Sequence, residues 1–240
     1  MLAELQKIAL ITGSAVRVGK YIIENLANDG WKIALHYHNS EQEAYNLAKS
    51  LLKYTDVMLF KADLNKQEQT SNLINQINQQ LGPVNLLINN AAIYNNDNIK
   101  NLRNDLLEST LQINLQAPLY LSEAMAKQEI SGNIINIIDS DIVHNMKKFF
   151  SYSLSKKSLL TLTQMLAFSL APHIRVNAVA PGPILFKEGQ NLELFNQLIN
   201  DSPLKNKPAL LELYQTIQFL INSPSITGQV IYLDGGRHLI

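Results

Sequence analysis

The sequence predicts a single α/β domain, with a doubly wound parallel sheet of seven strands and helices on both faces. Short apolar runs typical of buried strands alternate with longer segments of helical periodicity along the whole chain. The first apolar run leads directly into a glycine turn and a helix, the opening of a Rossmann unit. No change of composition marks a second domain, so we expect one domain over residues 1–240.

The composition narrows the function classes. The net charge is zero, which does not favour a nucleic-acid or membrane-surface partner. The absence of cysteine excludes disulfides and thiolate metal sites, and no metal site is expected. No apolar run reaches the roughly 18 residues of a membrane span. A first strand at about residue 7 leaves no room for a signal peptide, so we expect a cytoplasmic enzyme with a small-molecule substrate.

The glycine turn predicts a phosphate site. A strand over residues 7–12 runs into Gly13, Arg17, Val18 and Gly19, and a helix follows to about residue 29. Glycines let the backbone approach a pyrophosphate, and a helix N-terminus favours an anion. The alternative is an ordinary turn, but the strand before it and the helix after it favour a dinucleotide.

The end of the second strand, predicted over residues 31–37, indicates which dinucleotide. A Rossmann unit that prefers NAD ends this strand with an acid that binds the ribose hydroxyls. Here the strand runs into His38, Asn39 and Ser40, with no carboxylate before Glu41. These hydrogen-bond donors suit a 2′-phosphate, and hence NADPH. The alternative is that Ser40 only caps the helix predicted over residues 41–53.

The next two strands end in small and polar residues. The third, over residues 56–61, is followed by Asp63 and Leu64, and the fourth, over residues 84–89, by Asn90 and Ala91. Open α/β sheets bind ligands at this edge. A helix over residues 102–127 carries Asn114 in its middle, where Pro118 should bend the helix or free a carbonyl.

A candidate catalytic group follows the strand predicted over residues 134–138. Tyr152 and Lys156 are four residues apart, so a helix opening at Tyr152 places them on one face. An ammonium beside a phenol lowers the tyrosine pKa, and such a tyrosine can donate a proton. Asp139 stands thirteen residues before Tyr152 and could close on it. The alternative is a chance helical spacing beside a capping carboxylate.

These pieces resemble the short-chain dehydrogenase/reductase family across nearly the whole chain. The matching motifs are Thr12-Gly13-x3-Arg17-x-Gly19, Asp63, Asn89-Asn90-Ala91, Asn114, Tyr152-x3-Lys156, Arg175-Val-Asn177, Pro181-Gly182 and Asp234-Gly235-Gly236. Within the family the chain is similar to the pteridine reductase and dihydromonapterin (dihydrofolate) reductase branch. Three features carry that similarity: Arg17 in the glycine turn, His36-Tyr37-His38-x-Ser40 after the second strand, and Asp139 in place of the usual catalytic serine.

The resemblance implies NADPH as cofactor and a set of site residues. The cofactor residues would be Gly13, Arg17, Val18, Gly19, His38, Asn39, Ser40, Asp63, Leu64, Asn90, Ala91, Tyr152, Lys156, Pro181, Gly182 and Ile184. The catalytic residues would be Asp139, Tyr152, Lys156 and Asn114, and the substrate residues Arg17, Tyr94, Asp139 and Tyr152. The chain departs from the branch at Asn39, where an arginine is frequent, and Tyr94 could instead be a surface loop tyrosine.

The implied function is an NADPH-dependent reductase that transfers a hydride to a C=N bond of a pterin of the dihydromonapterin, dihydrobiopterin or dihydrofolate class. Lys156 would lower the Tyr152 pKa and hold the nicotinamide ribose, Asn114 would keep a water route, and Arg17 would bridge pyrophosphate and pterin. A substrate flap is expected at about residues 184–206, and the assembly is expected to be a homotetramer. The alternatives are a carbonyl reductase of 3-oxoacyl groups or other ketones, and a non-catalytic NADP(H)-sensing protein.

Overall fold

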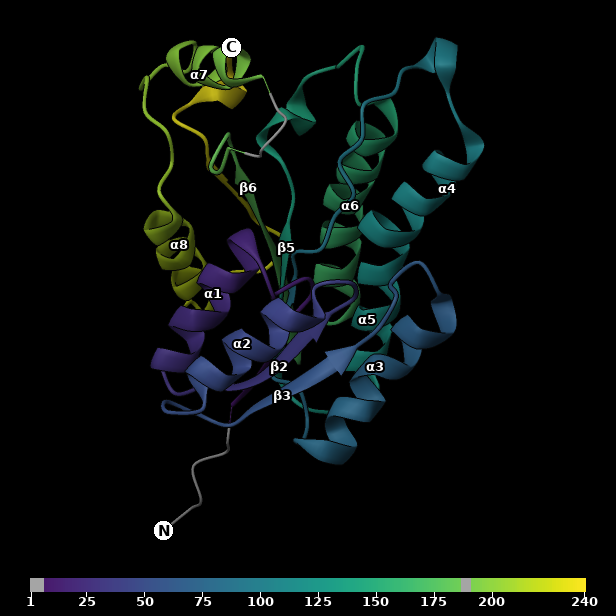
Figure 1. The fold of residues 1–240 in the computed structure, drawn as a ribbon, viewed down its shortest axis with the longest axis vertical. Coiled ribbons are helices and arrows are strands. Elements are labelled where there is room, and N and C mark those ends of the chain that lie inside the picture. The colour runs from purple at the N-terminus through teal and green to yellow at the C-terminus, as the bar shows by residue number, and fades with distance from the viewer. Residues whose placement is uncertain (1–6, 187–190) are drawn as a thin grey trace.

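The computed structural model describes residues 7–186 and 191–240. Its parallel strands form one sheet in the order β3-β2-β1-β4-β5-β6-β7 (Figure 1). The strands are β1 (Ile8–Ile11), β2 (Lys32–Tyr37), β3 (Val57–Lys61), β4 (Leu86–Asn89), β5 (Gly132–Ile137), β6 (Ile174–Pro181) and β7 (Val230–Leu233). The predicted fold class, a doubly wound seven-stranded sheet, is therefore confirmed.

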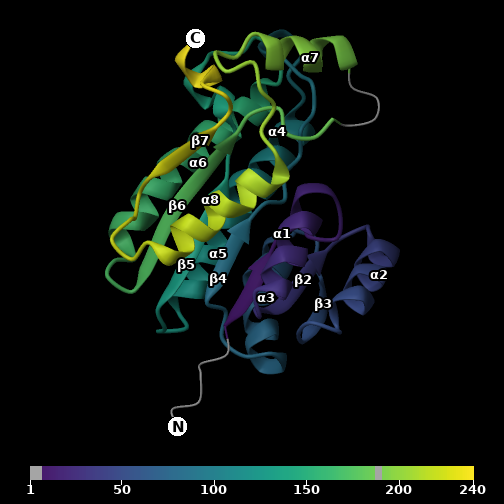
Figure 2. The same ribbon diagram turned by 90° about the vertical axis from the view of Figure 1, so that its left-hand side faces the viewer.

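Helices cover both faces because successive strand residues point to opposite sides of the sheet. Ile11 packs in one core with α1 (Arg17–Asn28), α2 (Glu41–Leu51) and α8 (Leu210–Asn222). Leu10 packs in the other with α3 (Gln67–Gln80), α5 (Ala117–Ala126) and α6 (Phe150–Ser169). Figure 2 shows α8 lying over the strands on the side that faces the viewer. The strands are apolar throughout because both of their faces are buried.

The sheet has its topological switch point between β1 and β4, which are neighbours although two strands separate them in sequence. Strands before the switch run outward to β3, and strands after it run the other way to β7. The helices after β1 and β4 therefore lie on opposite faces, which leaves a crevice at the carboxyl ends of these strands. Ligands of open α/β sheets bind in this crevice.

A buried histidine ties three strand ends together beside this crevice. The Nδ1 of His36 accepts the Gly13 N–H at 3.0 Å, so its Nε2 donates to the Ala62 carbonyl at 3.1 Å. Burial lowers the pKa of His36 to about 4, which keeps the ring neutral at ordinary pH. The glycine turn is thereby fixed to the ends of β2 and β3.

The continuous helix predicted over residues 102–127 is wrong in one respect. The segment is α4 (Asn104–Leu111), a π-helical turn η2 (Gln112–Gln116) and α5. Pro118 has no N–H, so the Asn114 carbonyl lacks its usual donor four residues on, and the wider π turn lies at this point. The irregularity expected around Asn114 is therefore present.

Three short helices and one longer one complete the described part of the chain: η1 (Ile99–Asn101), η3 (Ser140–Val143), η4 (Arg237–Leu239) and α7 (Leu192–Asn200). The predicted flap at about 184–206 includes α7, whose Phe195 packs edge-to-face on Phe186 at a centroid distance of 5.6 Å. Residues 187–190 of that segment lie outside the described residues. Over residues 7–186 and 191–240, no helix combines the length and apolarity needed to cross a bilayer.

Candidate active site

The glycine turn between β1 and α1 is shaped by close backbone contacts. A Cβ on Gly19 would lie 2.4 Å from the Gly13 carbonyl oxygen, and Gly13 itself has φ of 63°. Only glycine fits either position without a shift of the backbone. Arg17 also has a left-handed backbone, with φ of 54°, a strain of the kind that concentrates at ligand sites. Its guanidinium donates to the carbonyls of Leu185 and Phe186 at 3.3 and 3.5 Å.

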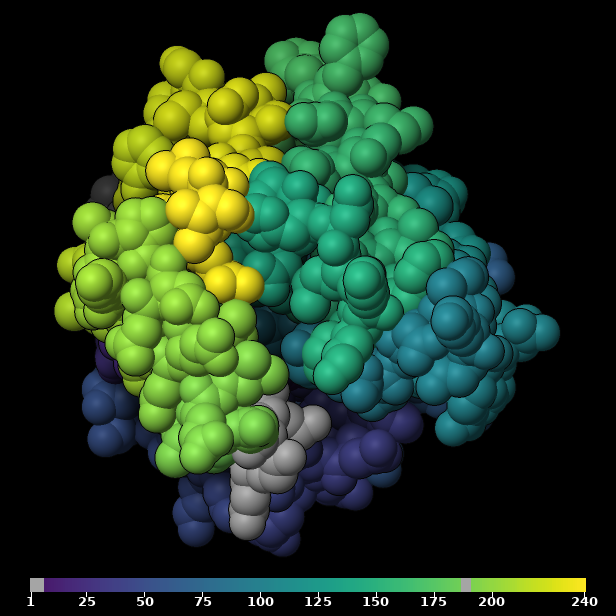
Figure 3. Space-filling model, turned by 90° about the horizontal axis from the view of Figure 1, so that it is seen from above, coloured from purple at the N-terminus to yellow at the C-terminus, as the bar shows by residue number. Residues whose placement is uncertain are grey.

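A cavity of about 440 Å³ opens between this turn and α6, the helix that carries Tyr152 and Lys156. It is lined by Gly13, Val16, Arg17, Val18, Gly19, Asn90, Ala91, Ala92, Ile137, Ile138, Tyr152, Lys156 and Pro181. Figure 3 looks down on this edge of the molecule and shows a hollow between the light-green segment that contains α7 and the teal segment that follows β5. The cavity therefore joins the predicted phosphate site to the predicted proton-transfer group.

Asp139 and Tyr152 meet across the connection between β5 and α6, as the spacing predicts. The Tyr152 hydroxyl donates to Asp139 Oδ2 at 2.7 Å, and Asp139 Oδ1 accepts the Asp141 N–H at 2.8 Å. Lys156, one helical turn after Tyr152, is buried and donates to the Ile137 carbonyl at 2.7 Å. Ser140, the residue after Asp139, is only 1% exposed. This serine is therefore packed inside the protein, while Asp139 faces Tyr152.

The acid–base properties of this group depend on burial as well as on charge. Burial and the nearby charge of Asp139 raise the pKa of Tyr152 well above its ordinary value, and these two effects outweigh any lowering by the Lys156 ammonium. Burial lowers the pKa of Lys156 to about 8. Burial and the charge of Asp141 raise the pKa of Asp139. The carboxyl of Asp139, rather than the phenol, is thus the group shifted toward neutral pH and suited to deliver a proton.

Two aromatic rings stand beside the phenol. Tyr94 packs edge-to-face on Tyr152 at a centroid distance of 4.7 Å and stacks on Phe149 at 4.4 Å with an interplanar angle of 13°. Phe149 has φ of 56° just before α6 begins, and this left-handed backbone brings its ring onto Tyr94. Phe149 therefore covers one face of the Tyr94 ring, and the Tyr94 ring contacts Tyr152, which lines the cavity.

The Asn114 side chain holds the segment after β4 in place. It acts on the charged group of Asp139 and Lys156 only indirectly. Its Oδ1 accepts the Ile93 N–H at 2.8 Å, and its Nδ2 donates to the Ile93 carbonyl and to Ser155 Oγ, both at 3.0 Å. This amide therefore joins the π turn, the loop that carries Tyr94 and helix α6.

Asp97 fixes the same loop to the start of α6. Its carboxylate is 3% exposed and accepts the Ser151 N–H at 3.1 and 3.3 Å, as well as the Ser151 hydroxyl. A carboxylate at a helix N-terminus satisfies free N–H groups and matches the helix dipole. Helix α6 is thus capped by a residue that lies in a loop 54 residues earlier in the chain.

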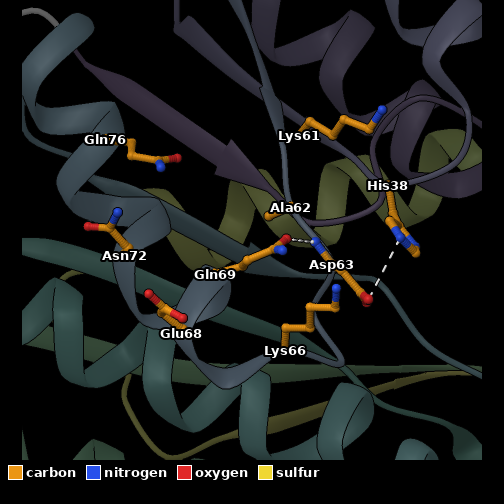
Figure 4. Close-up of a pocket in the computed structure, with 9 residues that line it drawn as sticks. All are labelled: His38, Lys61, Ala62, Asp63, Lys66, Glu68, Gln69, Asn72 and Gln76. Carbon is orange, nitrogen blue, oxygen red and sulfur yellow. Dashed lines mark hydrogen bonds and ion pairs between the residues drawn. The ribbon is translucent and has the colours of Figure 1, made fainter.

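A second cavity, of about 630 Å³, lies at the carboxyl end of β3 (Figure 4). It is lined by His38, Lys61, Ala62, Asp63, Lys66, Glu68, Gln69, Asn72 and Gln76. Asp63 is central to it: its carboxylate lies 3.9 Å from His38 Nε2, and its N–H donates to Gln69 Oε1 at 2.7 Å. Lys61 pairs with Tyr37 in the strand register, so this cation lies directly beside the end of β2.

The predicted residues separate into three groups. Nine of the predicted residues line the first cavity, Tyr152 and Lys156 among them, and His38 and Asp63 line the second. Eight others line neither cavity: Asn39, Ser40, Leu64, Tyr94, Asn114, Asp139, Gly182 and Ile184. Ser40 occupies the N-cap position of α2, yet its side chain makes no capping hydrogen bond, so the alternative role for this serine is not supported.

The sequence did not predict the contacts that four residues make in support of the site: His36, Asp97, Phe149 and Arg237. Asp97 lies in an asparagine-rich loop, and its partner is far away in sequence, so no local pattern identified it. Within the described residues, no group of three or more His, Asp or Glu side chains is arranged to hold a metal ion.

Known proteins resemble this chain over nearly its full length. A dihydromonapterin reductase of Shigella boydii is 26% identical over 235 residues, which is 96% of each chain. The structure of FolM alternative dihydrofolate reductase 1 from Brucella canis, complexed with NADP, superposes with a TM-score of 0.90 at 36% identity, over 98% of this chain and 95% of that one. A blue fluorescent protein from a metagenomic library, in complex with NADPH, gives 0.91 at 30% identity, over 96% and 97%. The short chain dehydrogenase family matches residues 7–193, so the chain belongs to this family of oxidoreductases.

Proposed function

We propose that the protein is an NADPH-dependent reductase that delivers a hydride to a C=N bond of a dihydropterin. The observation that carries the proposal is the contact between Tyr152 and Asp139, because it puts a carboxyl where a family member acting on ketones needs a hydroxyl. The names of the relatives, a dihydromonapterin reductase and an alternative dihydrofolate reductase, agree with it.

The residues present fit a nicotinamide dinucleotide. The turn at Gly13 and Gly19 has no room for a side chain, and the first N–H groups of α1 face the first cavity, which suits a pyrophosphate. The end of β2 carries no carboxylate, which suits a phosphate on the adenosine ribose. His38, Asn39 and Ser40 are the donors expected there.

Lys61 supplies a cation where this chain has Asn39 instead of an arginine. Its ammonium lies 3.3 Å from Glu41 Oε2, so it also offsets the first carboxylate of α2. A ribose phosphate at the end of β2 would meet this lysine and His38 together, since both line the same cavity (Figure 4).

Residues of this chain supply the proton that the reaction consumes. When bound, NADPH supplies the hydride. Reduction of a C=N bond also consumes a proton at the nitrogen, and Asp139 carries a raised pKa that suits a donor at neutral pH. Tyr152 orients that carboxyl by donating its hydroxyl to Asp139 Oδ2.

Several neighbours hold this group in place. Lys156 is fixed on the Ile137 carbonyl beside the first cavity, where its cation can meet a ribose hydroxyl. Tyr94, with Phe149 on one face of its ring, is the aromatic side chain expected beside the pterin ring. The substrate flap, the homotetramer and the cytoplasmic location stay predictions.

The direct test is NADPH oxidation measured against a panel of dihydropterins, dihydrofolate and ketones. We expect dihydropterins to give the highest kcat/KM, and Tyr152→Phe and Lys156→Ala each to lower it by roughly a hundredfold or more. A ketone as the best substrate would indicate a carbonyl reductase. Tight NADPH binding without turnover of any compound would indicate a cofactor-sensing protein.

A further inference from the structure

Arg237 makes a shielded ion pair next to the proposed proton donor. Its Nε donates to Asp141 Oδ1 at 3.1 Å, and the two side chains are 17% and 22% exposed. The other arginine and lysine ion pairs among the described residues each include at least one side chain that is more than a third exposed. A pair this far removed from solvent is screened less, so it can act on nearby charges.

The turn that carries Arg237 is held rigidly. Asp234 is 3% exposed, and its carboxylate accepts the N–H groups of Gly236 and His238 at 3.0 and 2.8 Å. The His238 ring bonds the same carboxylate at 3.0 Å and stacks on Tyr232. Arg237 is therefore presented from a fixed backbone, and little backbone entropy remains to be lost when it pairs.

Asp141 connects this pair to Asp139. Its side chain bonds Arg237, while its N–H donates to Asp139 Oδ1 at 2.8 Å. The other carboxylate oxygen of Asp139, Oδ2, accepts a hydrogen bond from the Tyr152 hydroxyl at 2.7 Å. A contact at the end of the chain thus reaches the phenol through two aspartates. In Figure 3 the yellow residues at that end lie against the teal segment that contains η3.

We propose that Arg237 is a positioning residue, which fixes the turn that aims Asp139 at Tyr152 and offsets the negative charge of Asp141 beside it. This inference rests on the proposed function, because it assigns Arg237 to the proton-delivery group. Arg237 itself touches neither Asp139 nor Tyr152 through any hydrogen bond found between described residues, so it acts through Asp141.

The charges around Asp139 set the sign of the effect. Burial and the charge of Asp141 raise the pKa of Asp139, whereas the Asp141 N–H, the Tyr152 hydroxyl and the charge of Lys156 lower it. Loss of the Arg237 cation leaves Asp141 uncompensated, which should raise the pKa of Asp139 further. Loss of the Asp141 charge should lower it. The titratable groups around this site are Asp141 from η3, Tyr152 and Lys156 from α6, and Tyr94 from the loop after β4. Arg237 and His238 of η4, with Asp234 directly after β7, complete the set.

The first measurement needs no substrate. Carboxyl ¹³C NMR of the ligand-free protein, with the Asp139 signal assigned from Asp139→Asn, gives the titration midpoint of this group. We expect Arg237→Met to raise the midpoint by about half a pH unit or more and Asp141→Asn to lower it. Arg237→Lys should keep most of the wild-type value because it retains the charge. Lys32→Met is the matched control, since it breaks an ion pair with Asp56 that is 2.6 Å long and lies at the opposite edge of the sheet.

An unchanged or lowered midpoint in Arg237→Met would overturn the proposal, as would an equal shift in Lys32→Met. The second measurement is the pH profile of kcat with NADPH and a dihydropterin. Its basic limb should move up in Arg237→Met and down in Asp141→Asn, because turnover requires the protonated carboxyl. If wild-type protein turns over no dihydropterin, the proposed function fails, while the NMR titration still decides the role of Arg237.

Discussion

Burial decides which residue of the site can move a proton. Lys156 is buried and Tyr152 and Asp139 are half-buried, and each pKa moves in the direction that favours the neutral form. For a carboxyl this shift is upward and brings its pKa toward neutral pH, whereas for a phenol it moves the pKa further away. The same burial therefore increases the protonated fraction of Asp139, which can then donate a proton, and makes ionisation of Tyr152 harder.

A residue-scale prediction concerns the cofactor. Charge-assisted hydrogen bonds are worth about 1.5–3 kcal/mol each, so NADPH should bind more than about tenfold tighter than NADH. Because Lys61 is half exposed and partly screened, we expect Lys61→Met to weaken NADPH binding by about three- to tenfold and to leave NADH binding unchanged. Fluorescence titration of both cofactors measures this.

The control is Lys66→Met, because Figure 4 shows Lys66 in the same cavity on the other side of Asp63. Equal weakening of both cofactors in Lys61→Met, or a larger loss of NADPH affinity in Lys66→Met, would argue against a phosphate contact at Lys61.

Residue spacing predicted the centre of the site but not its supports. The spacing of thirteen positions from Asp139 to Tyr152 suffices because a strand end and a helix start are close in such a fold. Arg237 and Asp141 are 96 residues apart, and nothing in the sequence around either one identifies the other. The direction of the Tyr152 pKa shift also depends on burial, which the spacing of two residues does not report.

At the scale of elements, the N-terminus of α6 depends on a carboxylate from another segment. We expect Asp97→Ala to lower the free energy of unfolding by about 0.5–2 kcal/mol, because it removes the cap of this helix. Turnover should also fall, since Asp97 fixes the loop that carries Tyr94. Urea denaturation and steady-state kinetics measure the two effects.

Asp105→Ala is the matched control, because this aspartate is exposed and its ion pair within residues 7–186 and 191–240 is with Arg103, two residues earlier. Equal stability of the two variants would contradict the capping role of Asp97.

Element boundaries were predicted within a few residues where periodicity and helix start or stop signals agree, as for α1 and α2. The helix around Asn114 was predicted less well. Proline indicated an interruption there, but the choice of a π turn depends on where the Asn114 amide finds partners, and those lie in the loop after β4.

For the molecule as a whole, the alternation of strands and helices predicted a doubly wound sheet, and the order of the strands follows from right-handed crossovers on both faces. The periodicity of apolar residues does not show how the strand ends are joined. His36 makes that connection between the glycine turn and the loop after β3.

A prediction about acid stability follows. The pKa of His36 is about 4 in the folded protein and about 6.5 in the unfolded chain, so only the unfolded chain gains a proton between these values. The stability contributed by neutral His36 is complete above pH 6.5 and is lost as pH falls to about 4. The loss should reach about 3 kcal/mol.

His36→Gln isolates this contribution, because an amide can still accept from Gly13 and donate to Ala62 but does not titrate. Denaturation curves from pH 7 to 4 should show a steeper loss of stability in the wild type than in the variant. Parallel pH dependences would mean that His36 is not the group responsible.

The central claim, that Asp139 makes this oxidoreductase a pterin reductase, is tested most directly by exchanging that residue. The measurement is kcat/KM of Asp139→Ser and Ser140→Ala on a dihydropterin and on a ketone, with NADPH. An ionised aspartate would repel a developing oxyanion, whereas a serine hydroxyl donates to it. Asp139→Ser should therefore lose the dihydropterin reaction and gain ketone reduction, while Ser140→Ala changes little. Full dihydropterin turnover in Asp139→Ser, with loss in Ser140→Ala, would contradict the claim.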